Sequence, residues 1–439
     1  MKGLNDYKKL VPIFMGVLLV ASIYGRVKAA REDATTYEDH LIAARDYRAG
    51  KIYATSKEEY QKALDMEESL DLYCEIEQML EEEANSSKIE AWCERIIEKY
   101  PNEPIGYEYL INHFKQRESY IDCFKQYEIV QKRGIVSENI ENTIASIKYK
   151  YTIDRKAYDS ISDFVSGYAV YEENGLFGLV SEDGGTKFKS MYVDMSASDG
   201  SYCAVTDEHG ESYYIDMEGD RRFNFPKDVK VSAIGKMYKN IIPVYSDSKL
   251  YYYTASDGIQ ILGPFDDGKA FSNGIAAVEE SGKWFAISTD GTKLTEGYEG
   301  FYMNSGGGIA SNGRVFANTG DGYVMLDENL QLVNNTKYED VRAFADDTYA
   351  AVKKDGKWGF IDNNGNFVIK PKYEDAYSFC QGLAPVCEGG LWGFIGDNDR
   401  WAVEPMFTDA RALNNSGCGF VKEQDELKWN MIKFVKNNY

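Results

Sequence analysis

Few side chains in this sequence have the types and the spacing that catalysis or metal binding requires. The three histidines, His40, His113 and His209, lie far apart and have no nearby ligand residues, so we predict no histidine-based metal cluster. The sequence contains no Gly-x-Ser-x-Gly motif, phosphate-binding loop, zincin helix or dinucleotide fingerprint. We therefore expect no catalytic, cofactor-binding or metal-binding residues, and we predict that the protein is not an enzyme.

The acidic residues suggest one alternative chemistry, the hydrolysis of glycosidic bonds by paired carboxylates. Asp183, Asp216, Asp290 and Asp362 each stand in a short polar cluster that contains a glycine. Aspartate in such a turn stabilises the local backbone, and this is the interpretation that we favour. A propeller-type carbohydrate-active hydrolase stays the alternative, and it requires two or three carboxylates that converge at one mouth of a β-domain.

The glycines and cysteines point to structure rather than chemistry. The run Ser305-Gly306-Gly307-Gly308 has no strand–helix context and is interpreted as a loop between β-strands. Seven cysteines are an odd number without regular spacing, so they do not form a disulfide framework, and we expect most of them to be buried. Cys380 and Cys387 are the one pair that neighbouring strands would bring together.

The overall composition limits the partners. A net charge of −22 and a pI near 4.7 argue against nucleic acid and against docking on anionic lipid. The 34 tyrosines suit aromatic sheet faces that pack together or contact peptides and carbohydrates.

One stretch near the C-terminus is nearly written twice. Residues 349–373 read YAAVKKDGKWGFIDNNGNFVIKPKY and residues 383–407 read LAPVCEGGLWGFIGDNDRWAVEPMF. Val352 and Val386 are equivalent, which sets the period at 386 − 352 = 34 residues. A period in this range indicates a repeat architecture.

Weaker copies extend the pattern to eight units. Equivalent apolar residues are Val170, Val205, Val244, Val278, Ala317, Val352, Val386 and Val421. Each is followed by a turn and an aromatic residue, which are in order Phe177, Tyr213, Tyr251, Trp284, Tyr323, Trp358, Trp392 and Trp429. Polar clusters with a glycine, such as Asn363-Asn364-Gly365-Asn366, predict hairpin turns. Each unit therefore predicts three or four short strands that must pack on neighbouring units.

The two clearest units carry a family resemblance. Gly356-Lys357-Trp358-Gly359-Phe360-Ile361-Asp362 and Leu391-Trp392-Gly393-Phe394-Ile395 resemble the signature of the bacterial WG-repeat proteins. The resemblance covers roughly residues 162–439, and the copies at Trp284 and Trp429 lack the glycine. It implies a β-rich interaction or scaffold module without an assigned catalytic activity.

Tandem units of this kind suit either a closed β-propeller or an open β-repeat stack. Closure removes exposed sheet edges, and the degenerate last unit is able to complete a blade with the first. We therefore favour an all-β propeller-like domain over residues 164–439, with about eight units, preceded by a linker over residues 152–163.

Residues 31–151 have the composition and spacing of helices. Tyr60, Trp92 and Phe124 repeat at intervals of 92 − 60 = 32 and 124 − 92 = 32 residues. The segment resembles a tetratricopeptide-like array of about three helix pairs, with a trailing helix near Ser137–Lys150. An all-α solenoid is therefore predicted, with its aromatic residues in the core.

The N-terminus predicts a membrane-anchor helix within residues 1–30. Leu10–Tyr24 contains no charge, and its extension from Tyr7 to Val27 approaches the length that spans a bilayer. A cleaved signal sequence ending near Val27-Lys28-Ala29 is the competing interpretation.

These features together predict a multidomain, single-pass membrane protein whose main body is extracytoplasmic. The predicted function is that of a membrane-tethered, non-catalytic scaffold, attached through the N-terminal helix. Its helical and β-repeat surfaces would bind a protein or peptide, or a cell-wall glycan.

Overall fold

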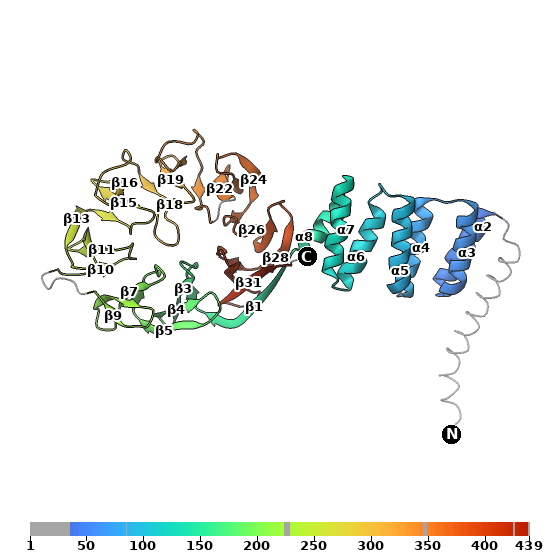
Figure 1. Cartoon of the computed structure of the whole chain (residues 1–439), viewed down its shortest axis with the longest axis horizontal. Coiled ribbons are helices and arrows are strands. Elements are labelled where there is room, and N and C mark those ends of the chain that lie inside the picture. Colours follow the sequence, from blue (N-terminus) through green and yellow to red (C-terminus); the bar gives the residue numbers. More distant parts are fainter. Residues whose placement is uncertain (1–35, 85, 224–228, 346–348, 425, 438–439) are drawn as a thin grey trace, which may run out of the picture. The chain divides into compact units, whose positions relative to one another are not determined.

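The structure of the chain is a computed structural model that describes residues 36–437 except 85, 224–228, 346–348 and 425. The chain divides into a helical unit that ends at Ile144 and a β unit from Ala145 to Asn437. Both units are shown in Figure 1.

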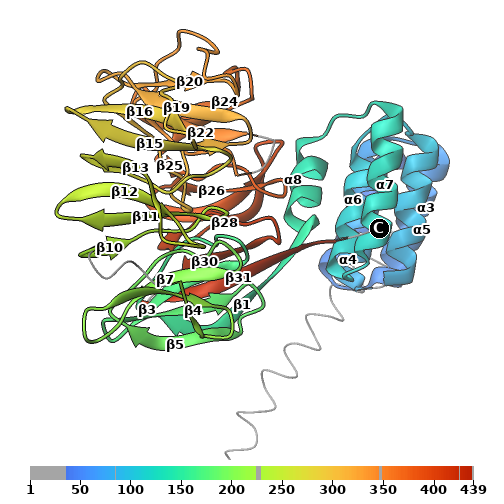
Figure 2. The same ribbon diagram turned by 60° about the vertical axis from the view of Figure 1, so that its left-hand side comes forward.

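The described residues form seven helices, which pack in sequential order. They are α2 (Tyr37–Ala49), α3 (Tyr53–Met66), α4 (Leu70–Glu83), α5 (Ser86–Lys99), α6 (Ile105–Gln116), α7 (Tyr120–Arg133) and α8 (Glu138–Ile147). Helices α2 to α7 stand side by side in Figure 1, and Figure 2 shows the same helices from another side. This agrees with the predicted three helix pairs and a trailing helix.

The predicted aromatic repeat lies in the core of the helical unit. Tyr60, Trp92 and Phe124 are all buried, in α3, α5 and α7 respectively. The Trp92 indole donates a hydrogen bond to the carbonyl of Tyr73 in α4 at 3.0 Å, so the second helix of one pair is fixed to the first. The helices are stabilised mainly by burial of these rings between helix pairs, and less by the helix propensity of their residues.

The predicted single-pass membrane localisation is wrong for the part of the chain that the structure describes. None of its helices is long and apolar enough to cross a bilayer. The longest have 14 residues, or about 21 Å, against a hydrocarbon core of about 30 Å. The predicted anchor or signal sequence, residues 1–30, lies outside the described residues.

The β unit is an eight-bladed β-propeller, with one antiparallel sheet for each blade. Blades are numbered here in chain order. Blade 1 contains β2 (Ser160–Ile161), β3 (Tyr168–Glu173), β4 (Leu176–Ser181) and β5 (Thr186–Tyr192). Blade 2 contains β6 (Asp194–Met195), β7 (Tyr202–Thr206), β8 (Ser212–Asp216) and β9 (Arg221–Arg222). Blade 3 contains β10 (Ala233–Ile234), β11 (Ile241–Ser246), β12 (Lys249–Thr254) and β13 (Gln260–Phe265). Blade 4 contains β14 (Asp267–Gly268), β15 (Ile275–Glu280) and β16 (Lys283–Ser288).

The second half of the ring follows the same order. Blade 5 contains β17 (Gly300–Phe301), β18 (Ala310–Ser311), β19 (Arg314–Asn318) and β20 (Tyr323–Leu326). Blade 6 contains β21 (Asp340–Val341), β22 (Ala350–Lys354), β23 (Lys357–Ile361) and β24 (Phe367–Tyr373). Blade 7 contains β25 (Asp375–Ala376), β26 (Leu383–Glu388), β27 (Leu391–Gly396) and β28 (Trp401–Phe407). Blade 8 contains β29 (Asp409–Ala410), β30 (Cys418–Lys422), β31 (Trp429–Lys436) and, from the start of the unit, β1 (Tyr149–Tyr158).

Blade 8 closes the ring by joining the two ends of the β unit. Strand β1 pairs antiparallel with β31 from Tyr149↔Lys436 to Tyr158↔Trp429, and the two strands lie side by side in Figure 1. The predicted linker over residues 152–163 is therefore wrong, since most of it belongs to β1 and β2. Strand β1 covers the edge of β31, which would otherwise be open for association with another strand.

The apolar core lies between neighbouring blades. One cluster combines Trp358, Phe360 and Tyr373 of blade 6 with Phe379 and Val386 of blade 7, together with other residues of both blades. Trp358 and Trp392 are 3% and 8% exposed, so both are core residues of adjacent blades. Each blade thus completes the core of the next, as tandem repeats require.

In three units, the residue that the structure places at the equivalent position is one residue away from the predicted one. In seven blades the predicted equivalent residue pairs with the second residue of the first strand, as in Ala376↔Val386. In blade 1 the partner of Ile161 is Tyr171 rather than Val170. In blades 2 and 3 the predicted aromatic residues, Tyr213 and Tyr251, lie at the position of the repeat glycine, because each pairs with the equivalent valine.

Candidate functional site

The centre of the propeller is formed by the first strands of the blades and the residues that follow them. Directly after each first strand, one backbone N–H donates to a carbonyl of the second strand at 2.8 to 3.1 Å. These eight equivalent residues, in blade order, are Ser162, Ser196, Gly235, Lys269, Tyr302, Arg342, Tyr377 and Arg411. They are called the axial layer below. Its small residues fall in blades 1 to 3, and its long basic and aromatic side chains in blades 4 to 8.

The repeat tryptophans support this axial layer. The guanidinium carbon of Arg342 lies 4.4 Å from the ring centre of Trp358 in the same blade, and that of Arg411 lies 4.7 Å from the ring centre of Trp429. The Tyr377 and Trp392 ring centres are 5.7 Å apart. Cation–π and ring contacts of this kind orient side chains. Each of these tryptophans therefore holds the axial-layer side chain of its own blade in place.

A ring of aspartates precedes the axial layer, and the sequence analysis missed it. In five blades the first strand begins with an aspartate whose carboxylate accepts a hydrogen bond from the next backbone N–H at 2.7 to 2.9 Å. These are Asp194, Asp267, Asp340, Asp375 and Asp409. The available signal was the recurring order aromatic-x-Asp, as in Tyr373-Glu374-Asp375.

One member of this ring, Asp375, is perturbed. Burial raises the pKa of the Asp375 carboxyl above its ordinary value, while the nearby charge of Arg342 acts in the opposite direction. The nearest Arg342 nitrogen is 3.5 Å from this carboxylate, which is longer than an ordinary charge-assisted hydrogen bond. In every member the bond to the next backbone N–H positions the start of the blade, and Asp267 also accepts a hydrogen bond from the Tyr245 hydroxyl at 3.0 Å.

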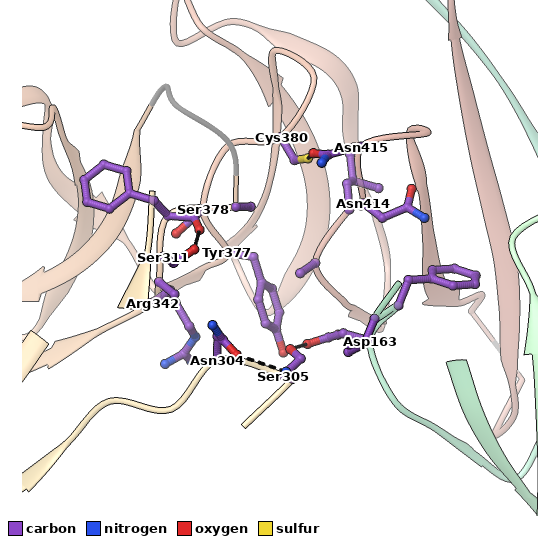
Figure 3. A pocket seen from close by; sticks show the side chains of 18 of the residues that line it. Asp163, Asn304, Ser305, Ser311, Arg342, Tyr377, Ser378, Cys380, Asn414 and Asn415 are labelled. Atoms are coloured by element: carbon purple, nitrogen blue, oxygen red, sulfur yellow. Dashed lines mark hydrogen bonds between the residues drawn. The ribbon is translucent and has the colours of Figure 1, made fainter. Parts of the chain in front are cut away.

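A cavity of about 410 Å³ lies on the other side of the axial layer. Its wall comes from the segments that follow the first strands in blades 1 and 3 to 8. Its lining is polar and apolar in equal measure, and Figure 3 shows the polar residues Asp163, Asn304, Arg342, Tyr377 and Asn414 around it. This volume falls within the range of small-ligand sites.

Two charged residues of the cavity depart from the repeat pattern. The position directly after the axial layer holds Asp163, Ala197, Lys236, Ala270, Met303, Ala343, Ser378 and Ala412 in blade order. Six blades thus place an uncharged residue there, and four of these are alanine. Only Asp163 and Lys236 are charged, and they have opposite signs.

Neither charge is fully satisfied by the protein. Asp163 Oδ2 accepts a hydrogen bond from Ser305 Oγ at 2.5 Å, whereas Oδ1 is buried without a hydrogen-bond partner among the described residues. The Lys236 ammonium lines the same cavity, and burial lowers its pKa. Within the described part of the chain, Lys236 makes no hydrogen bond or ion pair.

The glycine-rich run predicted as a loop forms part of this cavity. The Asn304 side chain accepts hydrogen bonds from the N–H groups of Gly306 and Gly308, and Ser305 reaches Asp163 of blade 1 from blade 5. A Cβ atom on Gly308 would lie 2.5 Å from the Cβ of Ser272, so this close approach requires glycine. The prediction of a loop is confirmed, and its place at the axis was not predicted.

The aspartates that the sequence singled out lie elsewhere. Asp183, Asp290 and Asp362 sit in turns after the third strands of blades 1, 4 and 6, and Asp216 is the last residue of the third strand of blade 2. Each accepts hydrogen bonds from backbone N–H groups of its own turn, and each has a lowered pKa. That of Asp290 falls to about 2, first because Ser288 donates to it. None of the four lines the cavity, so they are turn residues.

The histidines and cysteines also have local roles. His40 Nδ1 lies 2.7 Å from Glu59 Oε2 in the helical unit, and His113 is buried in α6. Among the described residues, no three His, Cys, Asp or Glu side chains are grouped as a metal site requires. Cys380 and Cys387 form no disulfide, because their thiols point to Asn415 and Glu374 respectively.

Solved structures similar to this chain include propellers, at low similarity. Hsv2 of Kluyveromyces lactis has 14% identity and a TM-score of 0.36, with 64% of this chain and 98% of that chain covered. A eukaryotic initiation factor has 13% identity and a TM-score of 0.41, with 67% and 91% covered. The WD40 β-propeller domain of Doa1 has 13% identity and a TM-score of 0.32, with 66% and 98% covered. Similarity this low indicates nothing about function. No curated protein matches the chain.

The family comparison is more specific. The model described as "WG containing repeat" matches residues 156–177, 265–284, 327–358, 358–392 and 392–426. These segments include Trp284, Trp358 and Trp392 and the residues of blades 6 and 7, in which Trp358 and Trp392 support the axial layer. WG repeats therefore occur at five places in the C-terminal region of this chain.

Proposed function

We propose that the protein is a non-catalytic interaction module whose propeller binds a peptide segment of a protein partner in the axial cavity. The observation that carries this proposal is the placement of Asp163 and Lys236, two incompletely paired charges of opposite sign, at a position where other blades have uncharged residues. An unpaired buried charge lowers stability. Binding of a polar ligand accounts for keeping both.

A non-catalytic role is proposed because the carboxylates have other tasks. The turn aspartates bind their own backbone, and the ring aspartates hold the first strands. A glycosidase needs one carboxyl that stays protonated and a second that is ionised, both facing the same sugar. Asp375 has a raised pKa, but its carboxylate already accepts the N–H of Ala376 at 2.8 Å. Release of reducing sugar from a cell-wall glycan would contradict this part of the proposal.

The helical unit supplies a second surface in this proposal. Its helix pairs resemble tetratricopeptide repeats, which present one helix of each pair to a groove. Arg45 and Glu75 join α2 to α4 at 2.5 Å, and Arg48 and Glu82 do so at 2.7 Å. Together with Lys51, these side chains line a shallow polar depression. We propose this depression as an auxiliary contact for the same partner.

Site-specific photocrosslinking tests the proposal in the full-length chain. A photoreactive amino acid replaces Ser166, an exposed residue of the cavity rim, or Met191, which is 59% exposed on the outer strand of the same blade. We expect a discrete crosslinked polypeptide with the label at 166 and not at 191. Excess unlabelled protein should compete for it. Identical products at both positions, or none at 166, would contradict binding at the cavity.

A further inference from the structure

The cavity contains more unsatisfied polar capacity than the Asp163 and Lys236 pair alone. Arg342 also lines it, and its closest carboxylate oxygens, on Asp375 and Asp340, are 3.5 and 3.6 Å away. The guanidinium face is covered by Trp358 at 4.4 Å. At the guanidinium edge, Nη1 donates to the carbonyl of Val341 at 3.4 Å and Nη2 to Asp375 at 3.5 Å. These long hydrogen bonds use two of the five N–H groups of an arginine, so donor capacity is left for a ligand. The cavity therefore offers one acceptor carboxylate and two cationic donors.

The cationic side chains of the cavity are paired less closely with carboxylates than arginines elsewhere in the protein are. Arg48 and Arg221 each bind a carboxylate at 2.7 Å, as is usual for arginine on a protein surface. The chain has a net charge of −22. Among the described residues, Asp199 is close enough for its charge to act on Lys236, but no carboxylate forms an ion pair with it. The arrangement fits a ligand that supplies both signs, with an ammonium for Asp163 Oδ1 and a carboxylate for the cations.

We propose that the axial cavity binds a short zwitterionic peptide, with its α-ammonium group at Asp163 and its α-carboxylate at Lys236 and Arg342. This inference rests on the proposed function of the cavity as a binding site and names its ligand class. The hydroxyl of Ser305 already donates to Asp163 Oδ2 at 2.5 Å and leaves Oδ1 for the ligand. Tyr302 and Tyr377 also line the cavity, and in the proposed complex they flank the ligand.

End-blocked peptides test the proposal without altering the protein. Binding of trialanine to the full-length chain is measured by isothermal titration calorimetry. The peptide is used with free ends, with an acetylated N-terminus, with an amidated C-terminus, and with both ends blocked. Loss of a charge-assisted hydrogen bond should weaken binding by about tenfold or more for each blocked end. Equal affinity for all four peptides, or no binding of the free peptide, would overturn the proposal.

Variants then assign each end of the peptide. Asp163→Asn should bind acetylated and free trialanine equally, and Lys236→Met should lose most of its preference for the free carboxylate. Asp247→Asn is the matched control, since Asp247 is exposed in the turn between β11 and β12, and it should behave as the unchanged protein does. The reverse assignment of ends would refute the orientation proposed here.

Two outcomes separate this inference from the proposed function. If Ser166 crosslinks a discrete partner while blocked and free peptides bind alike, the cavity binds something other than peptide ends, and this inference alone fails. If crosslinking at Ser166 also fails, both are wrong.

Discussion

Glu77 in α4 should make the stability of the helical unit fall as the pH rises. Its side chain is fully buried, and no group among the described residues donates a hydrogen bond to either carboxylate oxygen. When protonated, Glu77 can itself donate to Glu81, one turn further along the helix. Burial in the first place, and then the charge of Glu81, raise the pKa of Glu77 from its ordinary 4.5 to about 8. Cys93 of α5 and Tyr109 of α6 face the same charge.

The sign follows from proton linkage. Because the folded-state pKa is the higher one, the folded protein keeps a proton that the unfolded chain releases. The stabilisation is complete below the unfolded value of 4.5 and is lost as the pH rises through about 8. The pKa of Glu77 differs between the two states by 8 − 4.5 = 3.5. At about 1.4 kcal/mol for each pKa unit, the free energy of unfolding falls by at most about 5 kcal/mol.

Glu77→Gln tests this reasoning because glutamine has the same shape and cannot ionise. At about pH 5 the variant and the unchanged protein should unfold with free energies within about 1 kcal/mol, since both side chains are neutral. At about pH 9 the variant should be more stable by up to about 5 kcal/mol. Urea unfolding followed by the helical circular dichroism signal measures both values.

Glu94→Gln provides the matched control, because Glu94 is exposed on α5 and should show no such difference. A Glu77→Gln effect that is the same at both pH values would refute the buried, protonated carboxyl.

Three further predictions concern the propeller and the thiols. Trp358→Ala should destabilise the propeller by about 3–5 kcal/mol, measured by thermal unfolding, whereas Lys357→Ala on the exposed face should change it little. A β unit that begins at Ser160 lacks β1 and should aggregate or melt below one that begins at Ala145, because the edge of β31 is then open; equal melting temperatures would contradict closure by β1. Burial raises the pKa of the Cys387 thiol to about 11, and six of the seven cysteines are buried. A thiol reagent should therefore label at most one cysteine rapidly in the native chain and all seven in urea.

The repeat architecture was readable from sequence because its signals are local. The same order of strand, turn and Trp-Gly returns after 34 residues. Trp358 and Trp392 could therefore be aligned from the sequence without any knowledge of the fold. The helix pairs were found in the same way. The predicted alignment was wrong where two neighbouring residues suited the same position. Val170 and Tyr171 are both able to occupy a buried strand position, and only the pairing with Ile161 decides between them.

The closing strand and the cavity were not readable, since both depend on residues far apart in the chain. Ile153, in the predicted linker, pairs with Ile432, and a segment whose partner lies at the other end of the unit has the pattern of a linker. Asp163 and Ser305 meet across the axis from blades 1 and 5. No spacing rule within one repeat predicts that contact, because it depends on the number of blades in the closed ring.

Part of the cavity comes from segments that do not match the WG model. Lys236 and the Ser305–Gly308 loop fall in residues 178–264 and 285–326, which lie between the segments that match the WG model. Blades 6 and 7, which match it throughout, supply the tryptophans and the residues stacked on them, Arg342 and Tyr377. Packing between blades constrains the well-matched units, since a change in one blade disturbs the next. Lys236 and the Ser305–Gly308 loop, which no other blade repeats, thus lie outside the matched segments, whereas Asp163 lies inside one, residues 156–177. The charge pair of the cavity therefore joins a matched and an unmatched segment, and its opposite signs are brought together only by closure of the ring.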